Sequence, residues 1–310
     1  MPKTTITLGG VQVSNPDKVL YPAVGFTKTD VVSYYLSAAP FILPHLKNRP
    51  VSFKRFPDGV GRPAFWEKDA PGYAPAWVKT FPVSRTGGGR PIRYVLVNDQ
   101  RTLAWCANLA ALELHPFLHR APRIERPTLV VFDLDPGEGA DIFRCAEVAL
   151  RLREKLERLE LQAFPKVSGS KGLQIYVPLN TAVSYDLTQP FARTLAELLA
   201  QEHPRLIIAE MARAQRKGKV FIDWSQNTLH KTTVAVYSLR AKRERPYVSM
   251  PVSWPELERA LAARDRSRLE FEPEAALARL GKVGDLFAPV LKLEQRLPAA
   301  FAQAARRRPA

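Results

Sequence analysis

The chain is poor in the residues that build disulfide frameworks and zinc sites. Its 310 residues include two cysteines, Cys106 and Cys145, and five histidines. Two isolated cysteines offer neither metal-ligand spacing nor a disulfide framework, which excludes a zinc-stabilised or disulfide-stabilised module. Because both lie in apolar, helix-like surroundings, we interpret them as small core residues in a reducing cytoplasm.

Long apolar runs are also missing. No window approaches 18 uninterrupted apolar residues, so no membrane span is expected. Residues 1–10 lack a basic segment followed by an apolar one, so no secretory signal is expected. These two absences favour a cytoplasmic protein.

Acidic residues are scarce relative to basic ones. The chain has 46 Lys and Arg against 30 Asp and Glu, a formal charge of +16 and a pI near 10.0. This excess predicts a polyanionic partner, most simply nucleic acid. The alternative is a basic surface without such a partner. An apolar content of 46% is enough for a proper core, and the length suits one large domain or two moderate ones.

Strand and helix patterns are mixed along the chain. Gly9-Gly10 predicts a hairpin turn, and Thr27 to Asp30 has the form of a capping box. The class is therefore α/β or α+β, with a central sheet flanked by helices. The expected strands are residues 4–13 (as a hairpin), 49–66 (two pieces), 94–97, 173–179, 219–224 and 232–237, and the expected helices are 31–39, 101–114, 141–161, 190–200, 256–262 and 273–280.

Two aspartates close a run that predicts a buried strand. Residues 128–135 are rich in β-branched and apolar side chains and include Asp133 and Asp135. Because side chains two apart on a strand share a face, the two carboxylates project together. A third, Asp223, ends the apolar run 219–224. Hard divalent cations prefer such ligands, so the three predict a two-metal phosphoryl-transfer centre. The alternative is that each aspartate caps a turn or helix.

Two further segments carry groups suited to phosphate oxygens. Residues 167–172, Val-Ser-Gly-Ser-Lys-Gly, join two strand-like runs and offer hydroxyls, an ammonium and close backbone approach. They lack the spacing of a Walker A loop, and a plain exposed hairpin is the alternative. Downstream, Arg240, Lys242 and Arg243 end a strand-like run and can hold a triphosphate or a template backbone, or form a solvated basic strand end.

In this order, the segments resemble the three motifs of archaeo-eukaryotic primase-type polymerases. They are Val131-Phe-Asp-Leu-Asp-Pro136, Ser168-Gly-Ser-Lys-Gly172 and Phe221-Ile-Asp-Trp224. More narrowly, the chain resembles the polymerase domain of bacterial ATP-dependent DNA ligase D, the end-joining repair enzyme. The resemblance covers roughly residues 5 to 295 and includes the runs 14–22, 65–71, 114–116 and 231–240.

The resemblance implies roles for individual positions. Asp133, Asp135 and Asp223 match metal-binding aspartates, which implies two Mn²⁺ or Mg²⁺ ions between the incoming triphosphate and the primer 3′-hydroxyl. His115 matches a residue near the nucleotide sugar, and Arg240 one near its phosphates. The implied nucleotide-binding positions are Ser168, Ser170, Lys171, Gln174, His115, Arg240 and Lys54.

A second set of positions is implied to contact DNA. Lys18 and Lys28 match lysines that bind the 5′-phosphate across a gap, and Phe65 and Trp66 match an aromatic pair that stacks on the bent template. Taken alone, the lysines are typical of surface charge, and one of the aromatics is expected in the core. Lys54 and its neighbour Arg55 can contact either DNA or nucleotide.

The sequence departs from the family in two ways. Gln174 stands where the second motif usually carries a histidine, and glutamine can donate a hydrogen bond but carries no charge. Losing part of a hydrogen bond worth about 1.5–3 kcal/mol predicts slower turnover rather than none. No Lys-x-Asp-Gly ligase motif and no His-rich phosphoesterase segment occurs. We therefore expect a polymerase domain alone, either excised from a larger protein or encoded separately.

These observations combine into one expectation. Residues 1–300 form a single archaeo-eukaryotic primase-like domain with mixed and antiparallel sheets, followed by a basic tail at 301–310. Its parts are an end-binding part at about 1–125, a catalytic core at about 126–250 and a helical part at about 251–300.

The expected function is template-directed nucleotide addition in non-homologous end joining. The expected partners are gapped or 3′-overhang DNA with a 5′-phosphate, NTP or dNTP, Ku and an ATP-dependent ligase, in the nucleoid. The alternatives are a weakly catalytic or non-catalytic module that binds 5′-phosphorylated ends, and primer synthesis de novo.

Overall fold

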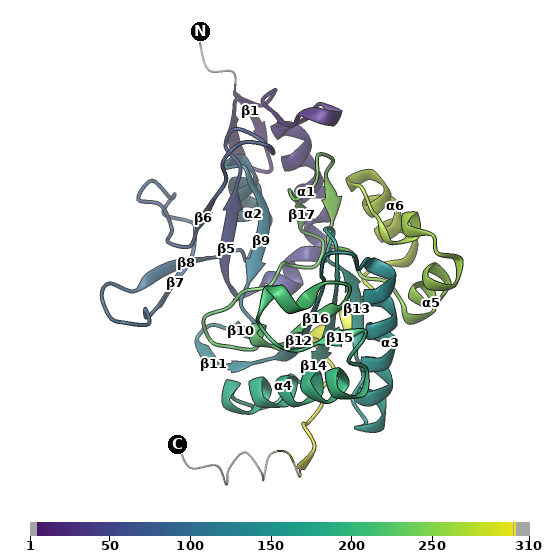
Figure 1. The fold of residues 1–310 in the computed structure, drawn as a ribbon. Coiled ribbons are helices and arrows are strands. Elements are labelled where there is room, and N and C mark those ends of the chain that lie inside the picture. The colour runs from purple at the N-terminus through teal and green to yellow at the C-terminus, as the bar shows by residue number, and fades with distance from the viewer. Residues whose placement is uncertain (1–4, 300, 302–310) are drawn as a thin grey trace. The chain divides into compact units, whose positions relative to one another are not determined.

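The computed structural model describes residues 5–299 and 301, and its chain divides into two compact units (Figure 1). Of the described residues, unit 1 comprises 5–122, 232–249 and 271–285. Unit 2 comprises 123–231, 250–270, 286–299 and 301. The mixture of helices with mostly antiparallel sheets confirms the predicted fold class.

Unit 1 is built on a five-stranded antiparallel sheet. The strand β5 (Pro50–Arg55) pairs with β6 (Phe65–Glu67) and β8 (Ile92–Leu96) on one edge and with β9 (Ala111–Pro116) on the other, and β7 (Thr80–Val83) pairs with β8. The other elements of this unit are β1 (Thr5–Leu8), β2 (Val11–Ser14), β3 (Val19–Tyr21), η1 (Pro22–Val24), β4 (Phe26–Thr27), α1 (Lys28–Leu46), α2 (Gln100–Asn108), β10 (His119–Arg120), β17 (Leu239–Arg240), β18 (Tyr247–Val248) and α6 (Pro273–Val283).

Unit 2 holds a second five-stranded sheet in the order β13-β14-β12-β16-β15. Its pairs are antiparallel except the edge pair β15–β16, so the sheet is mixed. Its strands are β12 (Leu129–Pro136), β13 (Phe164–Val167), β14 (Leu173–Pro178), β15 (Ile207–Ile208) and β16 (Val220–Asp223). The other elements are β11 (Arg123–Pro127), α3 (Ile142–Arg158), α4 (Tyr185–Glu202), η2 (Arg213–Arg216), η3 (Trp224–Gln226), α5 (Trp254–Ala263), η4 (Arg266–Leu269) and η5 (Ala288–Leu291).

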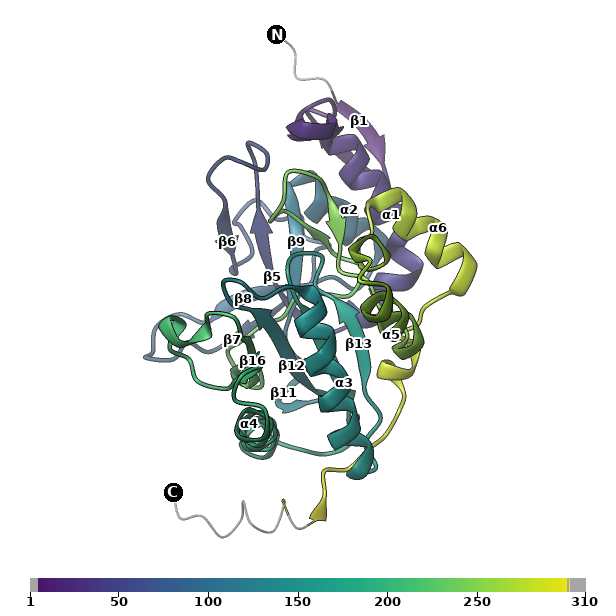
Figure 2. The ribbon, with the colours of Figure 1, turned by 45° about the vertical axis from the view of Figure 1, so that its right-hand side comes forward.

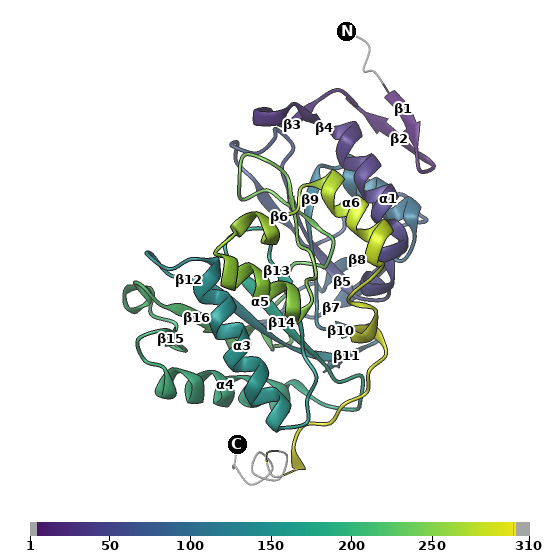
Figure 3. The ribbon, with the colours of Figure 1, turned by 90° about the vertical axis from the view of Figure 1, so that its right-hand side faces the viewer.

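Helices α3 and α4 lie side by side on one face of the unit 2 sheet, as Figures 2 and 3 show from two directions. Apolar side chains of that face, including Phe132, Leu134 and Ile175, are fully buried. The amphipathic pattern of α3 explains its position, because its apolar stripe needs an apolar sheet face to cover. The opposite face of β12 carries Asp133 and Asp135.

Several local signals in the sequence act as predicted. Thr27 and Asp30 form a capping box at the start of α1, which runs on through two prolines to Leu46. Asp141 caps α3. The β1–β2 hairpin turns at Gly9 and Gly10. Both cysteines are buried, as predicted.

Two predicted elements are wrong. The helix expected at 101–114 ends at Asn108, and Ala110, with a φ of 55°, turns the chain into β9. Alanine and leucine favour a helix locally, but pairing with β5 makes residues 111–116 a strand. The strand expected at 232–237 forms only a bridge to Phe117 and two amide hydrogen bonds, from Thr233 and Ala235, to carbonyls of β9, and it ends where Tyr237 takes a left-handed φ of 64°. In addition, α4 begins five residues before Pro190, which lies inside the helix.

Within the described residues, no helix is long and apolar enough to cross a membrane. The basic tail predicted at 301–310 lies outside the described residues except for Phe301.

Candidate active site

Three aspartates share one face of the unit 2 sheet. Asp133 on β12 is the direct cross-strand partner of Asp223 on β16, and Asp135 lies two residues further along β12. Directly opposed residues of an antiparallel pair have Cα atoms about 4.5–5.5 Å apart. The structure therefore brings the three predicted carboxylates together from segments ninety residues apart in the chain.

Gln174 lies on the other side of Asp133. It is the cross-strand partner of Asp133 on β14, it is buried, and its side chain hydrogen-bonds the Asp133 carboxylate. Lys166 on β13 is in turn the partner of Gln174. Because directly opposed residues share a face, Lys166, Gln174, Asp133 and Asp223 form one row across four strands.

The electrostatics of the row favour a bound cation. Burial, with the nearby charges of Asp135 and Asp223, raises the pKa of Asp133 to about 8, although Gln174 and Lys166 oppose this shift. Carboxylates that repel one another in a partly desolvated place either take up a proton or hold a cation. Their oxygens are the ligands that Mg²⁺ and Mn²⁺ prefer, so the donor set fits such ions.

Asp223 also has a structural task. Its Oδ1 accepts hydrogen bonds from the amide and hydroxyl of Ser225, at 2.9 and 2.5 Å, and its Oδ2 accepts one from Gln226 at 2.9 Å. Lys231 donates to the Ser225 hydroxyl. Asp223 thus caps η3, as the alternative for these aspartates predicted. In residues 5–299 and 301, no three His, Cys, Asp or Glu side chains already stand as a metal-holding group.

Asn227 couples this turn to the central strand. Its side-chain oxygen accepts from the Val131 amide at 2.8 Å, and its amide nitrogen donates to the Val131 carbonyl at 2.7 Å. The side chain therefore imitates a strand partner of β12. It holds the turn that follows Asp223 against the strand that carries Asp133.

The loop between β13 and β14 is a tight hairpin. The Ser168 amide donates to the Gly172 carbonyl at 2.9 Å, and the Ser168 hydroxyl accepts from the amides of Ser170 and Gly172 at 3.2 and 3.3 Å. A Cβ at Gly172 would stand 2.0 Å from the Leu134 carbonyl oxygen, so only glycine fits there. Lys171 is exposed at the tip. The fold is the predicted hairpin, with its lysine open to a ligand.

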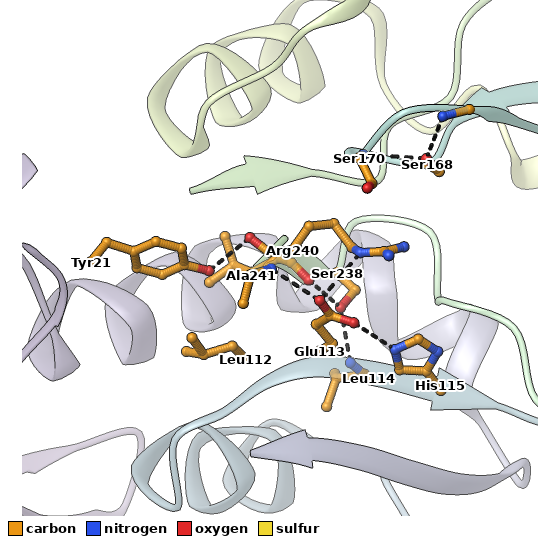
Figure 4. A network of polar contacts seen from close by, with 12 residues as sticks. Tyr21, Leu112, Glu113, Leu114, His115, Ser168, Ser170, Ser238, Arg240 and Ala241 are labelled. Carbon is orange, nitrogen blue, oxygen red and sulfur yellow. Dashed lines mark hydrogen bonds and ion pairs between the residues drawn. The ribbon is translucent and has the colours of Figure 1, made fainter. Parts of the chain in front are cut away.

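In unit 1, a buried carboxylate organises two of the predicted nucleotide-binding residues (Figure 4). Glu113 accepts a hydrogen bond from His115 Nε2 at 2.9 Å and one from the Ala241 amide at 3.0 Å, and pairs with Arg240 Nε at 3.5 Å. Tyr21 supports the same strand end by donating its hydroxyl to the Arg240 carbonyl at 2.9 Å. The side chains of Tyr21, Glu113, His115 and Arg240 are buried.

The pKa of Glu113 moves in the opposite direction to that of Asp133. Burial alone would raise it, but the hydrogen bond from His115, the charge of Arg240 and the Ala241 amide outweigh burial and lower the pKa to about 2. Glu113 is therefore a permanent anion that fixes the positions of His115 and Arg240. Glu113 was not identified from the sequence, because this residue lies in the segment 101–114 that was predicted to be a helix. Glu113 lies two residues before His115 on β9, so the two side chains share a face, and this spacing could have identified Glu113 as a partner of His115.

Other basic residues of unit 1 lie around a pocket. A cavity of about 510 Å³ is lined by Lys242 and Arg243, with Pro22, Val60 and Ala241 among its other walls. Lys54 is half-buried, and burial, with the charges of Lys242 and Arg240, lowers its pKa despite the opposite pull of Glu113.

The two predicted phosphate-binding lysines differ in environment. Lys28 is buried and donates to the Ser14 carbonyl at 2.6 Å; burial first, then the charges of Lys18 and Arg55, lower its pKa. Lys18 is more open and pairs with the exposed Asp58 at 2.8 Å. The positive charges of Lys18 and Arg55 therefore act on the Lys28 ammonium.

The predicted aromatic pair is open to solvent on β6. Phe65 is 45% exposed and Trp66 50%, so the expectation that one of them is buried is wrong. The Phe65 ring lies against the Arg55 guanidinium at 5.1 Å, and the Trp66 ring meets His115 edge-on at 4.7 Å. Pairing with β5 turns two adjacent side chains to opposite faces, and neither face at this sheet edge is covered.

Comparison with known proteins identifies the family of the chain. Residues 27–287 match the family model described as LigD, primase-polymerase domain. The chain is 43% identical over 282 residues to the multifunctional non-homologous end joining protein LigD of Mycolicibacterium smegmatis, covering 90% of the chain and 36% of that protein. It is 32% identical over 253 residues to the bifunctional non-homologous end joining protein LigD of Bacillus subtilis, covering 81% of the chain and 40% of that protein.

Among solved structures, the chain is similar to the polymerase domain from Mycobacterium tuberculosis ligase D in complex with DNA. The TM-score is 0.84 at 39% identity, covering 92% of the chain and 99% of that domain. The chain spans little more than a third of the length of the curated relatives it matches. The chain thus belongs to the LigD primase-polymerase domain family, a family of nucleotidyltransferases.

Proposed function

We propose that this chain is a template-directed nucleotidyltransferase that fills gaps and extends 3′ ends at DNA breaks. The observation that carries the proposal is the cross-strand pairing of Asp133 with Asp223, with Asp135 on the same face. The similar domain of M. tuberculosis ligase D was solved with DNA, which supports DNA as the partner. The charge of +16 agrees with a polyanionic substrate.

Asp133, Asp135 and Asp223 are proposed to hold two divalent cations, Mn²⁺ or Mg²⁺. Such ions lower the pKa of a hydroxyl nucleophile and neutralise a pyrophosphate leaving group. The carboxylates fix where this charge is placed, while the Gln174 amide orients Asp133 and Ser225 orients Asp223. The chemistry is an in-line attack of the primer 3′-hydroxyl on the α-phosphate.

The nucleotide contacts are proposed position by position. Ser168, Ser170 and Lys171 would hold the triphosphate, because the hairpin tip presents an ammonium and a hydroxyl. Arg240 and Lys54 would contact phosphates, and His115 the sugar. Glu113 keeps His115 and Arg240 in fixed orientations, which supports a role in positioning a ligand over one in general surface charge.

The DNA end is proposed to bind through a different set. Lys18 and Lys28 would hold the 5′-phosphate on the far side of a gap, since a buried ammonium near two other cations attracts an anion. Phe65 and Trp66 would stack on the template, because they are large, adjacent and exposed.

The larger setting is also a proposal. We propose that residues 1–300 act as one polymerase domain in end joining, in the nucleoid, alongside Ku and an ATP-dependent ligase. The names of the relatives support this setting, since each is an end-joining LigD protein of which the chain matches a part.

The test is primer extension on a gapped duplex with a 5′-phosphate, with Mn²⁺ and Mg²⁺ and with ribo- and deoxyribonucleotides compared. Asp133→Ala should lower incorporation by roughly 10³-fold, because metal ions contribute several kcal/mol to such reactions. Asp186→Ala is the matched control, since Asp186 is an exposed acid on α4. Normal incorporation by the Asp133 variant would refute the proposal.

A second candidate is a non-catalytic or weakly catalytic module that binds 5′-phosphorylated ends. The observation that favours it is the capping role of Asp223, whose two carboxylate oxygens already accept three hydrogen bonds. This candidate predicts tight binding to 5′-phosphorylated gapped DNA without incorporation even in Mn²⁺. Any extension in the assay above excludes a non-catalytic module, and rapid extension excludes a weakly catalytic one.

A further inference from the structure

A buried lysine lies in the same row as the carboxylates. Lys166 on β13 has no exposed surface, although lysine almost never occurs fully buried without a compensating charge. It is the direct partner of Gln174, which is the direct partner of Asp133. No inferred role in substrate binding explains this lysine.

The surroundings of Lys166 are suited to a fixed cation. Its ammonium lies 5.4 Å from the centre of the Tyr176 ring, and Tyr176 stands two residues after Gln174 on β14, so both side chains face the same side of the sheet. The Gln174 side chain, between the two in the row, hydrogen-bonds Asp133. A buried cation and a partly buried carboxylate on one face of one sheet stabilise each other if both are present.

We propose that Lys166 is the resident counterion of the carboxylate centre, a positioning residue that partly neutralises Asp133 and its neighbours in the metal-free protein and thereby weakens divalent-cation binding. The inference rests on the proposed metal-binding function of the aspartates. A full positive charge that stays in place competes with an arriving cation at every stage. The carboxylates then repel one another less in the metal-free protein, and the ions that they bind remain exchangeable.

A counterion and a purely structural residue predict opposite changes in metal affinity when Lys166 is replaced. If Lys166 only supported the fold, its loss would disorder the carboxylates and weaken metal binding. A resident counterion predicts the reverse, because removing it leaves the carboxylates more negative. Replacement by methionine leaves an unbranched side chain, shorter by only one atom, that can still pack on Tyr176, but it removes the charge.

The experiment measures Mn²⁺ affinity by electron paramagnetic resonance and metal-free thermal stability in EDTA. Lys166→Met should bind Mn²⁺ roughly tenfold more tightly than the unaltered protein, because a positive charge is removed from the row that holds the carboxylates. Its metal-free melting temperature should fall, and saturating Mn²⁺ should restore it. Lys166→Arg, which keeps the charge, should resemble the unaltered protein in Mn²⁺ affinity. The control Lys217→Met removes an exposed lysine of the same unit and should change neither quantity.

A double variant tests the pairing directly. Because Lys166 and Asp133 compensate each other, Lys166→Met with Asp133→Asn should be more stable without metal than Lys166→Met alone. Equal or weaker Mn²⁺ affinity in Lys166→Met, or no recovery in the double variant, would overturn the inference. If Asp133→Asn alone leaves Mn²⁺ binding intact, the proposed metal-binding function itself has failed, which separates the two outcomes.

Discussion

Asp133 and Glu113 are both acids set among polar groups on strands, yet their pKa values move in opposite directions. Glu113 in unit 1 is met by His115, Arg240 and a backbone amide, and its pKa falls to about 2. Asp133 in unit 2 stands among other carboxylates and its pKa rises to about 8. The protein has compensated the charge of Glu113 fully and that of Asp133 only in part, and a bound cation or proton can compensate the rest.

The opposite pKa shifts distinguish a carboxylate that supports the fold, Glu113, from one that is suited to binding a cation, Asp133. A carboxylate with a complete set of donors gains nothing from a ligand and serves to hold its neighbours in place. A carboxylate that faces other carboxylates is strained until a cation or a proton arrives. The contrast therefore predicts which acid a metal ion stabilises and which acid the fold depends on.

The largest effect on folding is expected at Glu113. Glu113→Gln removes a buried anion that pairs with the buried Arg240 guanidinium and accepts a hydrogen bond from His115, which should cost about 3 kcal/mol of unfolding free energy at neutral pH. Urea denaturation of both proteins measures this quantity. Glu125→Gln, an exposed acid of β11, should change it little, and an equal loss in both variants would contradict the distinction.

The pH dependence of the two acids should have opposite signs. The folded pKa of Glu113 lies below its unfolded value of about 4.3, so its contribution is present above that pH and is lost as the pH falls towards about 2. The stability gap between the unaltered protein and Glu113→Gln should therefore close in acid. Denaturation curves between pH 2 and 5 measure it, and a constant gap would show that the charge of Glu113 is not what matters.

For Asp133 the folded pKa lies above the unfolded value of about 3.9, so ionisation destabilises the metal-free protein as the pH rises from about 4 to about 8. In EDTA, Asp133→Asn should gain stability relative to the unaltered protein across this range and then level off. Thermal melts at each pH measure the gain. Saturating Mn²⁺ should reverse the order of the two proteins, and a relative loss in EDTA would refute the strained-acid interpretation.

The smallest effect is expected at an exposed acid that is already paired. Asp58 holds the Lys18 ammonium, and the hydrogen bond and charge of Lys18 lower the pKa of Asp58. Asp58→Asn should leave the melting temperature unchanged but free Lys18 for a 5′-phosphate, raising the preference for phosphorylated over unphosphorylated gapped DNA by roughly threefold.

Competition binding with the two ends measures this preference, and Asp17→Asn is the control for general loss of negative charge. Lys18→Ala with Lys28→Ala should remove most of the discrimination. If that double variant still discriminates, the phosphate pocket lies elsewhere.

The sequence predicted the elements whose causes are local. The capping box at Thr27, the Gly9-Gly10 turn and the amphipathic stripe of α3 each depend on residues a few positions apart. The strand that carries Asp133 and Asp135 belongs to this group, since its apolar run and the two-residue spacing suffice.

Features that depend on long-range pairing could not be predicted. Local preference favoured a helix through residue 114, but pairing with β5 makes residues 111–116 the strand β9. The same pairing fixes the positions of Glu113 and His115. The register that opposes Asp133 to Asp223 and Gln174 is set by three strands together. The burial of Lys166 could not be predicted, because a single lysine in a strand is typical of the protein surface.

The side chain of Asn227 has a consequence for how the carboxylate centre responds to motion. Because it hydrogen-bonds both backbone groups of Val131, the turn after Asp223 moves together with β12. Bending or sliding of the central strand then carries both facing acids along together, and the gap between them changes less than the sheet itself does. The distance between the two carboxylates that would hold a cation is therefore nearly constant when the sheet bends.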